Sequence, residues 1–316
     1  MKGNSRITWA FTLIALLGAS SAATAADCVP GVREITFSSG GRNTRADLVL
    51  PPSFRAGQRV PLVIGLHPSG GSGRSFDDDT GLTARAGHKH FAVLLADGAL
   101  QTGDGSGHFW NIPGVPLVSG ATVPPGTRDD IRFIGDAIDE VVKNHCIDPK
   151  RVSVTGFSGG ARMSSMVACR LADRVAAIAP VAGLRAGRAG GLEFAEPDPA
   201  DCTPWKPVRV LAIHGTDDRT NPYAGGGGVR WGYSVERAAA RWASLDGCDS
   251  APRSDTVSAH VTRIRYGACS DASAVELYRI DASEAEGGGH VWPGGKRAPK
   301  AELNATELVL EFFARP

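Results

Sequence analysis

Short apolar runs alternate with amphipathic stretches along most of this 316-residue chain, and that alternation limits the folds open to it. The runs are rich in β-branched residues and end in glycine or turn-forming residues, as strands do when both faces of a parallel sheet are covered. We predict strands at residues 60–66, 91–96, 152–155, 177–181, 208–213 and 275–280.

Helical periodicity fills the intervals between these runs. In residues 129–144, Ile131, Ile134 and Ile138 share one face, and Asp129 stands at the N-terminal end, where the helix dipole favours an acid. The remaining predicted elements are helices at residues 162–172, 235–245 and 303–313 and an antiparallel hairpin at residues 33–37 and 45–50. The order predicts an α/β fold, a mostly parallel central sheet flanked by helices with antiparallel lead-in strands.

Two stretches, residues 99–128 and 185–207, are rich in glycine and proline and show no periodicity. Loops of this length inside a compact domain are usually functional or disordered. Whether 99–128 closes over a ligand stays open at this point. Because no linker or internal repeat divides the chain, we predict one domain over residues 26–316.

The N-terminus has the pattern of a secretory signal peptide. Lys2 and Arg6 precede an apolar run at residues 7–17, and Ala23-Thr24-Ala25 fits the small-residue cleavage pattern. The apolar run is shorter than the roughly 20 residues that a membrane span needs. We predict a signal peptide over residues 1–25 and a secreted mature protein, extracellular or periplasmic, without membrane association.

Charge and cysteine content are consistent with an exported globular protein. Lys plus Arg number 34 and Asp plus Glu number 33, so the chain lacks the basic excess that nucleic-acid binding needs. The spacing predicts a Cys248–Cys269 disulfide; the other four cysteines stay open, with Cys169–Cys202 and Cys28–Cys146 favoured. No C-x-x-C or H-E-x-x-H spacing occurs, so no metal site is predicted.

The strongest chemical signal is Gly156-Phe157-Ser158-Gly159-Gly160, which follows the predicted strand at 152–155 and precedes a helix. A G-x-S-x-G sequence in that position is typical of a nucleophile elbow, a sharp turn that exposes a reactive serine. Small residues flank the serine because larger side chains would collide in such a turn. Ser158 is the predicted nucleophile.

A serine nucleophile needs a base that accepts its proton, and that base follows the elbow in the chain. His214, His260 and His290 are the candidates. We favour His290 because it lies in a glycine-rich loop after the predicted strand at 275–280. His214 is interpreted as a structural residue that braces the end of its strand.

The base in turn needs an acid that orients it, placed between the serine and the histidine. Asp217 and Asp218 both follow the predicted strand at 208–213, and spacing alone does not choose between them. A tetrahedral oxyanion needs backbone N–H donors. We expect them from Gly159 and from Ser69, because Pro68 before it has no N–H.

Several motifs in chain order resemble the family of secreted polyhydroxybutyrate depolymerases and feruloyl or acetylxylan esterases, a carbohydrate esterase family one type of the α/β-hydrolase superfamily. The resemblance spans about residues 45–315 and rests on Ser158-Gly159-Gly160, His214-Gly215-Thr216-Asp217-Asp218, Pro222-Tyr223 and Gly288-Gly289-His290-Val291-Trp292-Pro293-Gly294. It implies that Asp218 is the acid and Ser69 an oxyanion donor. Two departures are His67-Pro68-Ser69, where the family usually has His-Gly-Cys, and Gly159, where it commonly has asparagine.

The resemblance implies a secreted serine carboxylesterase with no cofactor, acting on feruloyl or acetyl esters of plant polysaccharide or on related small esters. Alternatives are a short-chain polyhydroxyalkanoate depolymerase, a peptidase, and a catalytically silent binding protein on the same fold. Trp110 and Trp292 are candidate walls of a substrate pocket, or else packing residues. The sequence does not determine the acyl group or the oligomeric state.

Overall fold

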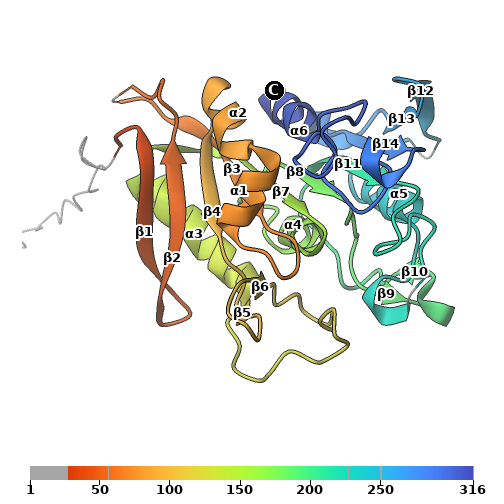
Figure 1. Ribbon diagram of the computed structural model, residues 1–316, viewed down its shortest axis with the longest axis horizontal. Helices are drawn as coiled ribbons and strands as arrows, with labels where there is room; N and C mark the ends of the chain where they lie inside the picture. The colour runs from red at the N-terminus through yellow and green to blue at the C-terminus, as the bar shows by residue number, and fades with distance from the viewer. Residues whose placement is uncertain (1–27, 56, 227, 250, 316) are drawn as a thin grey trace, which may run out of the picture.

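The computed structural model describes residues 28–315 apart from 56, 227 and 250, and it is built on one ten-stranded sheet (Figure 1). The predicted signal peptide at residues 1–25 lies outside the described residues. The strands follow one another across the sheet as β1 (Gly31–Ser39), β2 (Arg42–Leu50), β4 (Ala92–Ala96), β3 (Val60–Leu66), β7 (Ile147–Phe157), β8 (Ala177–Val181), β11 (Arg209–Gly215), β14 (Val275–Ile280), β13 (Val261–Tyr266) and β12 (Arg253–Thr256).

The six central strands, from β4 to β14, pair in parallel, and the pairs at both ends of the sheet are antiparallel. The β1–β2 hairpin turns at Gly40 and Gly41, whose φ angles are 57° and 77°. Two consecutive residues with positive φ suit the tight turn of a twisted hairpin, and glycine adopts that conformation without strain. The predicted α/β fold with antiparallel lead-in strands is confirmed.

Helices cover both faces of the sheet and form a hydrophobic core on each (Figure 1). One face carries α3 (Asp130–Asn144), α4 (Gly159–Arg170) and α5 (Val235–Leu245), and the other carries α1 (Gly73–Thr80), α2 (Leu82–His88) and α6 (Ala305–Ala314). Asp129 caps α3 by accepting hydrogen bonds from the N–H groups of Ile131 and Arg132. The four predicted helices are confirmed to within a few residues, the largest shift being the start of α4 at Gly159.

Helices α1 and α2 and the antiparallel pair β12–β13 are not predicted by the sequence pattern. Helix α1 is short and polar, with Phe76 as its one large buried side chain. In β13, which lies between β14 and the edge strand β12, only Val261 and Ile264 are buried, so it shows no continuous apolar run. Exposed edge strands carry polar residues on both faces, which removes the pattern that identifies a buried strand.

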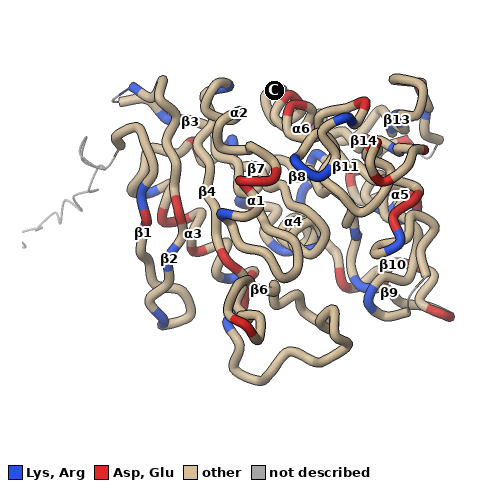
Figure 2. Tube along the Cα trace, viewed as in Figure 1, with Lys and Arg blue, Asp and Glu red and all other residues tan. Residues whose placement is uncertain are grey.

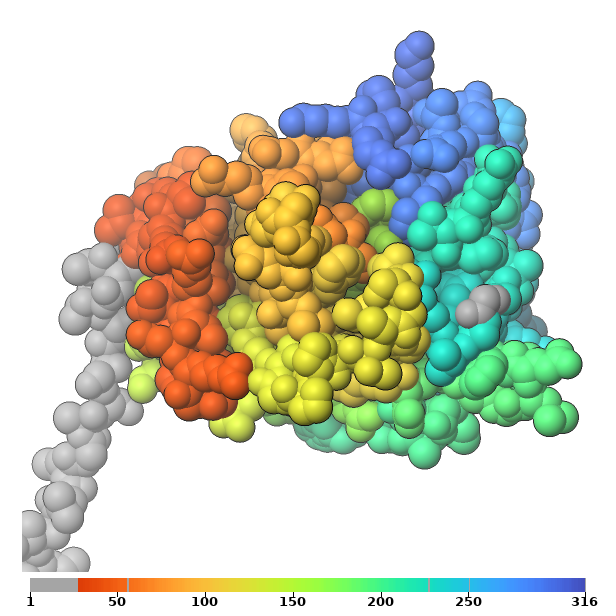
Figure 3. Space-filling model, turned by 60° about the horizontal axis from the view of Figure 1, so that its bottom comes forward, coloured from red at the N-terminus to blue at the C-terminus, as the bar shows by residue number. Residues whose placement is uncertain are grey.

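The two long loops contain only short elements. Residues 99–128 include β5 (Leu100–Gln101) and β6 (His108–Phe109), and residues 185–207 include β9 (Ala189–Gly190), a 3₁₀ turn at Leu192–Phe194 and β10 (Glu196–Pro197). Figure 3 shows the first segment, in yellow, lying across the middle of one face of the molecule beside the β1–β2 hairpin.

Three disulfides join Cys248 to Cys269, Cys169 to Cys202 and Cys28 to Cys146, which confirms the predicted pair and both favoured ones. Acidic and basic residues are interspersed along the chain, without a large region of one sign (Figure 2). Within residues 28–315, none of the helices combines the length and the apolar character that crossing a bilayer requires.

Candidate active site

Four loops meet at the edge of the sheet where the parallel strands end. Ser69 follows β3, Ser158 follows β7, Asp218 follows β11 and His290 follows β14. Parallel strands place their carboxyl ends at one edge, so residues far apart in sequence converge there. This edge of the sheet therefore gathers the residues that the sequence analysis selected.

Ser158 occupies a strained turn between β7 and α4. Its φ and ψ angles are 54° and −110°, a conformation that side-chain-bearing residues rarely adopt. The backbone leaves no room for side chains at two neighbours: a Cβ on Gly156 would lie 2.5 Å from the Gly160 carbonyl carbon, and one on Gly160 would lie 2.1 Å from the Leu66 oxygen. The glycines of the motif thus permit the close crossing of β3 and α4 that positions the serine.

The three residues predicted as nucleophile, base and acid lie in hydrogen-bond contact. The Nε2 atom of His290 is 2.9 Å from the Oγ atom of Ser158, and its Nδ1 atom is 2.8 Å from an Oδ2 atom of Asp218. A neutral imidazole protonated on Nδ1 donates to the carboxylate and leaves Nε2 free to accept the serine proton. This arrangement can make the Ser158 hydroxyl nucleophilic, because His290 can take its proton.

Asp218 is buried and held ionised. Burial disfavours its charge, but hydrogen bonds from His214 and His290 outweigh that cost and keep the pKa of Asp218 well below its usual range. Its Oδ1 atom also accepts from the N–H groups of Thr220 and Asn221, at 2.9 and 2.8 Å. A carboxylate satisfied in this way stays negative and fixes the imidazole in one orientation.

Asp217, the adjacent acid, points away from the histidine. Its side chain is 42% exposed and pairs with the exposed Arg219 at 3.4 Å. The backbone N–H of Asp217 donates to the Gly288 oxygen at 2.9 Å, which joins the acid loop to the histidine loop. A Cβ on Gly215 would lie 2.0 Å from that same oxygen, so the close approach of the two loops requires glycine there.

His214 lies behind Asp218 and does not contact Ser158. Its Nε2 atom is 2.9 Å from the Asn221 carbonyl oxygen and 3.3 Å from an Oδ2 atom of Asp218. The side chain is buried at the end of β11. This position agrees with its interpretation as a structural brace. His260 hydrogen-bonds to Glu302 instead.

The two predicted oxyanion donors lie next to each other. A Cβ on Gly159 would be 3.0 Å from the Ser69 nitrogen, so the two residues are in van der Waals contact. Within the described part of the chain, no acceptor bonds to the N–H of either residue. Two free N–H groups beside the serine match the requirement for holding a developing oxyanion.

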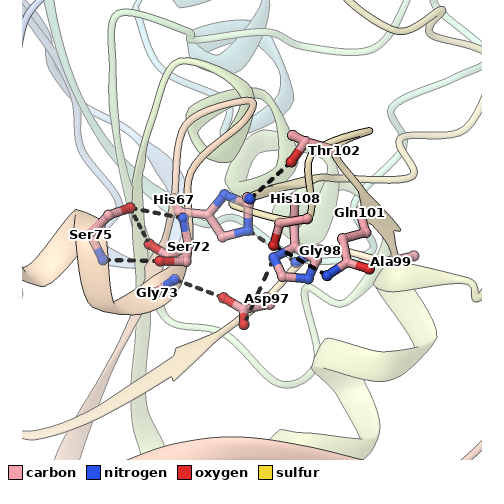
Figure 4. A network of polar contacts seen from close by, with 12 residues as sticks. His67, Ser72, Gly73, Ser75, Asp97, Gly98, Ala99, Gln101, Thr102 and His108 are labelled. Atoms are coloured by element: carbon pink, nitrogen blue, oxygen red, sulfur yellow. Dashed lines mark hydrogen bonds and ion pairs between the residues drawn. The ribbon is translucent and has the colours of Figure 1, made fainter.

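His67 connects the loop that carries Ser69 to Gly98, and Figure 4 labels His67 and Gly98. Its Nδ1 atom is 2.8 Å from the Pro68 oxygen and its Nε2 atom accepts from the Gly98 N–H at 3.0 Å. Burial lowers the pKa of His67 to about 4, so the ring is neutral at pH 7. Trp110 stacks on this ring, with centroids 4.6 Å apart, and its Nε1 atom donates to the His67 oxygen at 2.8 Å.

The loop after β4 completes this support. Asp97 accepts from the Gly73 N–H at the start of α1, at 2.8 Å, and approaches His108 at 3.9 Å (Figure 4). The backbone of His108 also pairs with the loop that carries Ser69: its C=O accepts from the Gly70 N–H, and its N–H donates to the Gly71 oxygen. The sequence analysis missed this role of His67, although its position directly after a buried strand was a usable signal.

The two tryptophans differ in position. Trp110 is 4% exposed but lines a cavity of about 10 Å³ together with Ser69 and Gly159. Trp292 is fully buried, and its Nε1 atom donates to the Thr306 hydroxyl at 2.9 Å while its ring packs edge-on against Phe76. Trp292 is therefore a core residue on the face of α1 and α6, and its assignment as a pocket wall is wrong.

Arg162, one helical turn after Ser158, is a second residue that the sequence analysis missed. It is 5% exposed, lines the same cavity as the oxyanion donors and faces a second cavity with Arg185 and Arg230. Only its spacing from the serine could have marked it, since an arginine in a helix is usually exposed. Over the described ranges, no group of His, Cys, Asp and Glu could hold a metal ion.

Comparison with known proteins finds relatives that are named esterases. No family model matches the chain. It is 30% identical to feruloyl esterase B of Piromyces equi over 78% of this chain, and spans 42% of that protein's length. It is also 25% identical to the putative esterase NocK of Nocardia uniformis, over 91% of this chain and 83% of that protein.

Solved structures share the fold. Acetyl xylan esterase from Aspergillus awamori superimposes with a TM-score of 0.54 at 15% identity, over 83% of this chain and 95% of that one. A structure described as pOPH_S172C in complex with DMSO gives a TM-score of 0.55 at 12% identity, over 92% and 87%. At sequence identities this low, structural similarity indicates a shared fold and not a shared function. The chain is an α/β-hydrolase-fold protein whose sequence relatives are feruloyl, acetylxylan and putative esterases.

Proposed function

We propose that this protein is a serine carboxylesterase that works through an acyl-enzyme formed on Ser158. The observation that carries the proposal is the pair of contacts made by His290, 2.9 Å to the Ser158 hydroxyl and 2.8 Å to the Asp218 carboxylate. A histidine between a serine and a buried carboxylate is the arrangement that nucleophilic acyl transfer needs.

In the proposed reaction, Ser158 attacks the ester carbonyl as His290 takes its proton. The N–H groups of Ser69 and Gly159 hold the tetrahedral oxyanion, and Asp218 stabilises the imidazolium. The imidazolium then protonates the departing alcohol, which leaves the acyl group on the serine oxygen. Water, deprotonated by His290, attacks the acyl-enzyme and releases the acid.

Two features support an ester as the substrate and export as the location. Relatives that match most of this chain are named esterases, among them feruloyl esterase B and, over 84% of this chain, a probable feruloyl esterase C of Aspergillus terreus. Disulfides form in oxidising compartments outside the cytosol, and this chain carries three. The proposed substrates are feruloyl or acetyl esters of plant polysaccharide or related small esters, acted on by a secreted enzyme.

The test is acid release from methyl ferulate, acetylated xylan and a hydroxybutyrate oligomer by the mature protein. Ser158→Ala should abolish turnover of every substrate that the wild type cleaves. The matched control is Ser164→Ala, because Ser164 is also buried on α4 and its hydroxyl donates only to the Ala161 oxygen at 2.8 Å. Equal rates for Ser158→Ala and wild type would reject the mechanism, and cleavage of the oligomer alone would favour the depolymerase alternative.

A further inference from the structure

Three arginine side chains gather beside the proposed nucleophile without a carboxylate partner. Arg162 and Arg185 are 5% and 7% exposed, and Arg230 is half-buried. In the described ranges, no Asp or Glu forms an ion pair with any of the three, and each has at least one buried guanidinium nitrogen without a hydrogen-bond acceptor. Buried arginines are normally paired, so this cluster is unusual.

Arg185 is fixed by its surroundings. Its guanidinium carbon lies 3.3 Å from the centre of the Trp231 ring, and its Nη1 atom donates to the Trp231 and Tyr233 oxygens at 3.0 and 2.6 Å. Arg162 has far weaker partners, a single contact of 3.4 Å from Nη1 to the Arg230 oxygen. Arg162 is therefore the member of the cluster with hydrogen-bonding capacity to spare.

Arg162 lies between two small cavities. The first, about 10 Å³, is lined by Ser69, Gly159 and Trp110, and the second, about 20 Å³, by Arg185 and Arg230. Both cavities share Arg162 and the apolar side chains of Ile112 and Val115. The arginines thus lie directly beyond the predicted oxyanion donors.

The cluster remains positively charged at neutral pH. Burial, together with repulsion from Arg230 and Arg185, lowers the pKa of Arg162 to about 9, and burial lowers that of Arg185 to about 10. Both values stay above 7, so the protein holds adjacent buried cations that nothing in its described residues neutralises. An anion placed here would form charge-assisted hydrogen bonds at groups whose desolvation cost has already been met.

We infer that the acyl pocket accepts an acid whose far end carries a carboxylate, so that the substrate is the half-ester of a dicarboxylic acid. The inference rests on the proposed esterase function and narrows its acyl group. The acyl side is indicated because Ser69 and Gly159 line the first cavity, which shares Arg162 with the second, whereas His290, which would protonate the leaving alcohol, lines neither.

The residues that line the cavity indicate what kind of spacer joins the two carboxyl groups of the substrate acid. The second cavity is lined by the apolar side chains of Ile112, Val115, Met166 and Val229 beside the guanidinium groups, which suits a hydrocarbon or aromatic spacer. Each cavity has room for about one water molecule. Substrate entry therefore needs the segment carrying Ile112 and Val115, within the 99–128 loop, to shift outward.

The covalent chemistry is that of the proposed esterase. Ser158 forms the acyl bond, the methanol oxygen of a methyl half-ester leaves with a proton from His290, and water releases the diacid. The far carboxylate is neither made nor broken, and it serves only to hold the acyl chain against Arg162.

The experiment compares kcat/KM for monomethyl adipate and dimethyl adipate, which share the acyl chain and differ in the charge of its far end. The wild type should prefer the half-ester, and Arg162→Met should lower that preference by about 100-fold, as expected when one partner of a buried charge pair is removed. Arg162→Lys should restore part of it. The control Arg132→Met removes an arginine that is 63% exposed on α3 and should leave the preference unchanged.

Binding separates this inference from the proposed function. Calorimetry with Ser158→Ala protein should detect monomethyl adipate, and adding Arg162→Met should abolish that binding. Binding without turnover in the wild type would keep the anion site and reject the esterase. Turnover with no preference and no Arg162 dependence would reject the anion site alone. If Arg162→Met lowers the melting temperature, Arg230→Met, which removes a neighbouring cation and leaves Arg162 in place, supplies a second loss of preference to measure.

Discussion

Two clusters of buried charged side chains adjoin Ser158, and they differ in how their charge is balanced. On one side, Asp218 receives hydrogen bonds from His290, Thr220 and Asn221 and is fully compensated. On the other, Arg162 and its neighbours have no acid at all in the described part of the chain.

The difference indicates what each cluster is for. A carboxylate whose acceptors are satisfied internally can hold a histidine in place whether or not a ligand is present. A buried cation without a counter-charge is costly to the folded protein unless something external completes it. The first cluster is therefore suited to chemistry and the second to recognition.

Removing the base, His290, is expected to cause the largest loss of activity among variants of the Asp218 cluster. His290→Ala should lower kcat by about 10⁴-fold or more, as much as Ser158→Ala does, because the two residues act as a unit. The double variant should be no worse than either single one. Steady-state kinetics on the best ester measures this, and additive losses would contradict the shared role.

Replacing the acid, Asp218, should cause the next largest loss of activity, and the adjacent Asp217 provides a matched control. Asp218→Ala should lower kcat by roughly 10³- to 10⁴-fold, because the histidine loses the group that sets its tautomer. Asp217→Ala should stay within about twofold of wild type, since the Asp217 side chain is 42% exposed and contacts only Arg219. An inactive Asp217→Ala beside an active Asp218→Ala would reverse the assignment.

His67 tests whether the loop that carries Ser69 needs its support. His67→Ala leaves the Gly98 N–H without its acceptor and removes the ring that stacks on Trp110. We expect kcat to fall by about 10- to 100-fold with KM little changed, because an oxyanion donor matters only in the transition state. His67→Gln, which offers an acceptor again, should recover part of kcat; a loss confined to KM would argue against this role.

Asp246 is a buried acid beside Val208, at the start of β11, and it forms no ion pair with any described residue. It extends the comparison from catalysis to stability. Burial raises its pKa to about 6, although Ser273 and the Val208 N–H donate to it. A folded-state pKa above the unfolded value of 3.8 means that stability falls as pH rises from about 4 to 6 and stays lower above that range.

Replacing Asp246 with a neutral residue should therefore stabilise the protein at neutral and alkaline pH, and not at acidic pH. Asp246→Asn should exceed the wild type by up to about 3 kcal/mol in free energy of unfolding at pH 8, and the gain should vanish below pH 4. Urea unfolding of both proteins from pH 4 to 8 measures the difference. A gain that does not change with pH would show that ionisation of Asp246 is not its source.

Local sequence patterns anticipated the central part of the fold. The strands at Val60–Leu66, Ala177–Val181 and Val275–Ile280 match their predicted ranges, because strands covered on both faces need continuous apolar runs. The strands β12 and β13, at the antiparallel end of the sheet, were missed because few of their residues are buried and polar residues interrupt any apolar run. Trp292 was misplaced for a related reason, since a tryptophan in a loop motif gives no sign of whether the loop folds inward.

By itself, the amino-acid sequence determined the features that depend on neighbouring residues: the strand–turn–helix around Ser158, the glycines that let it form, and the order of serine, acid and histidine. The spacing of Asp217 and Asp218 left the acid open, the family resemblance implied Asp218, and the tertiary structure places Asp218 against His290. Only the tertiary structure decided that Trp292 is core and that Arg162 lies buried with Arg185 and Arg230. A turn is specified by the sterics of a few adjacent residues. A contact between loops separated by many residues depends on how the whole sheet and its helices pack, and a one-dimensional pattern does not contain that packing.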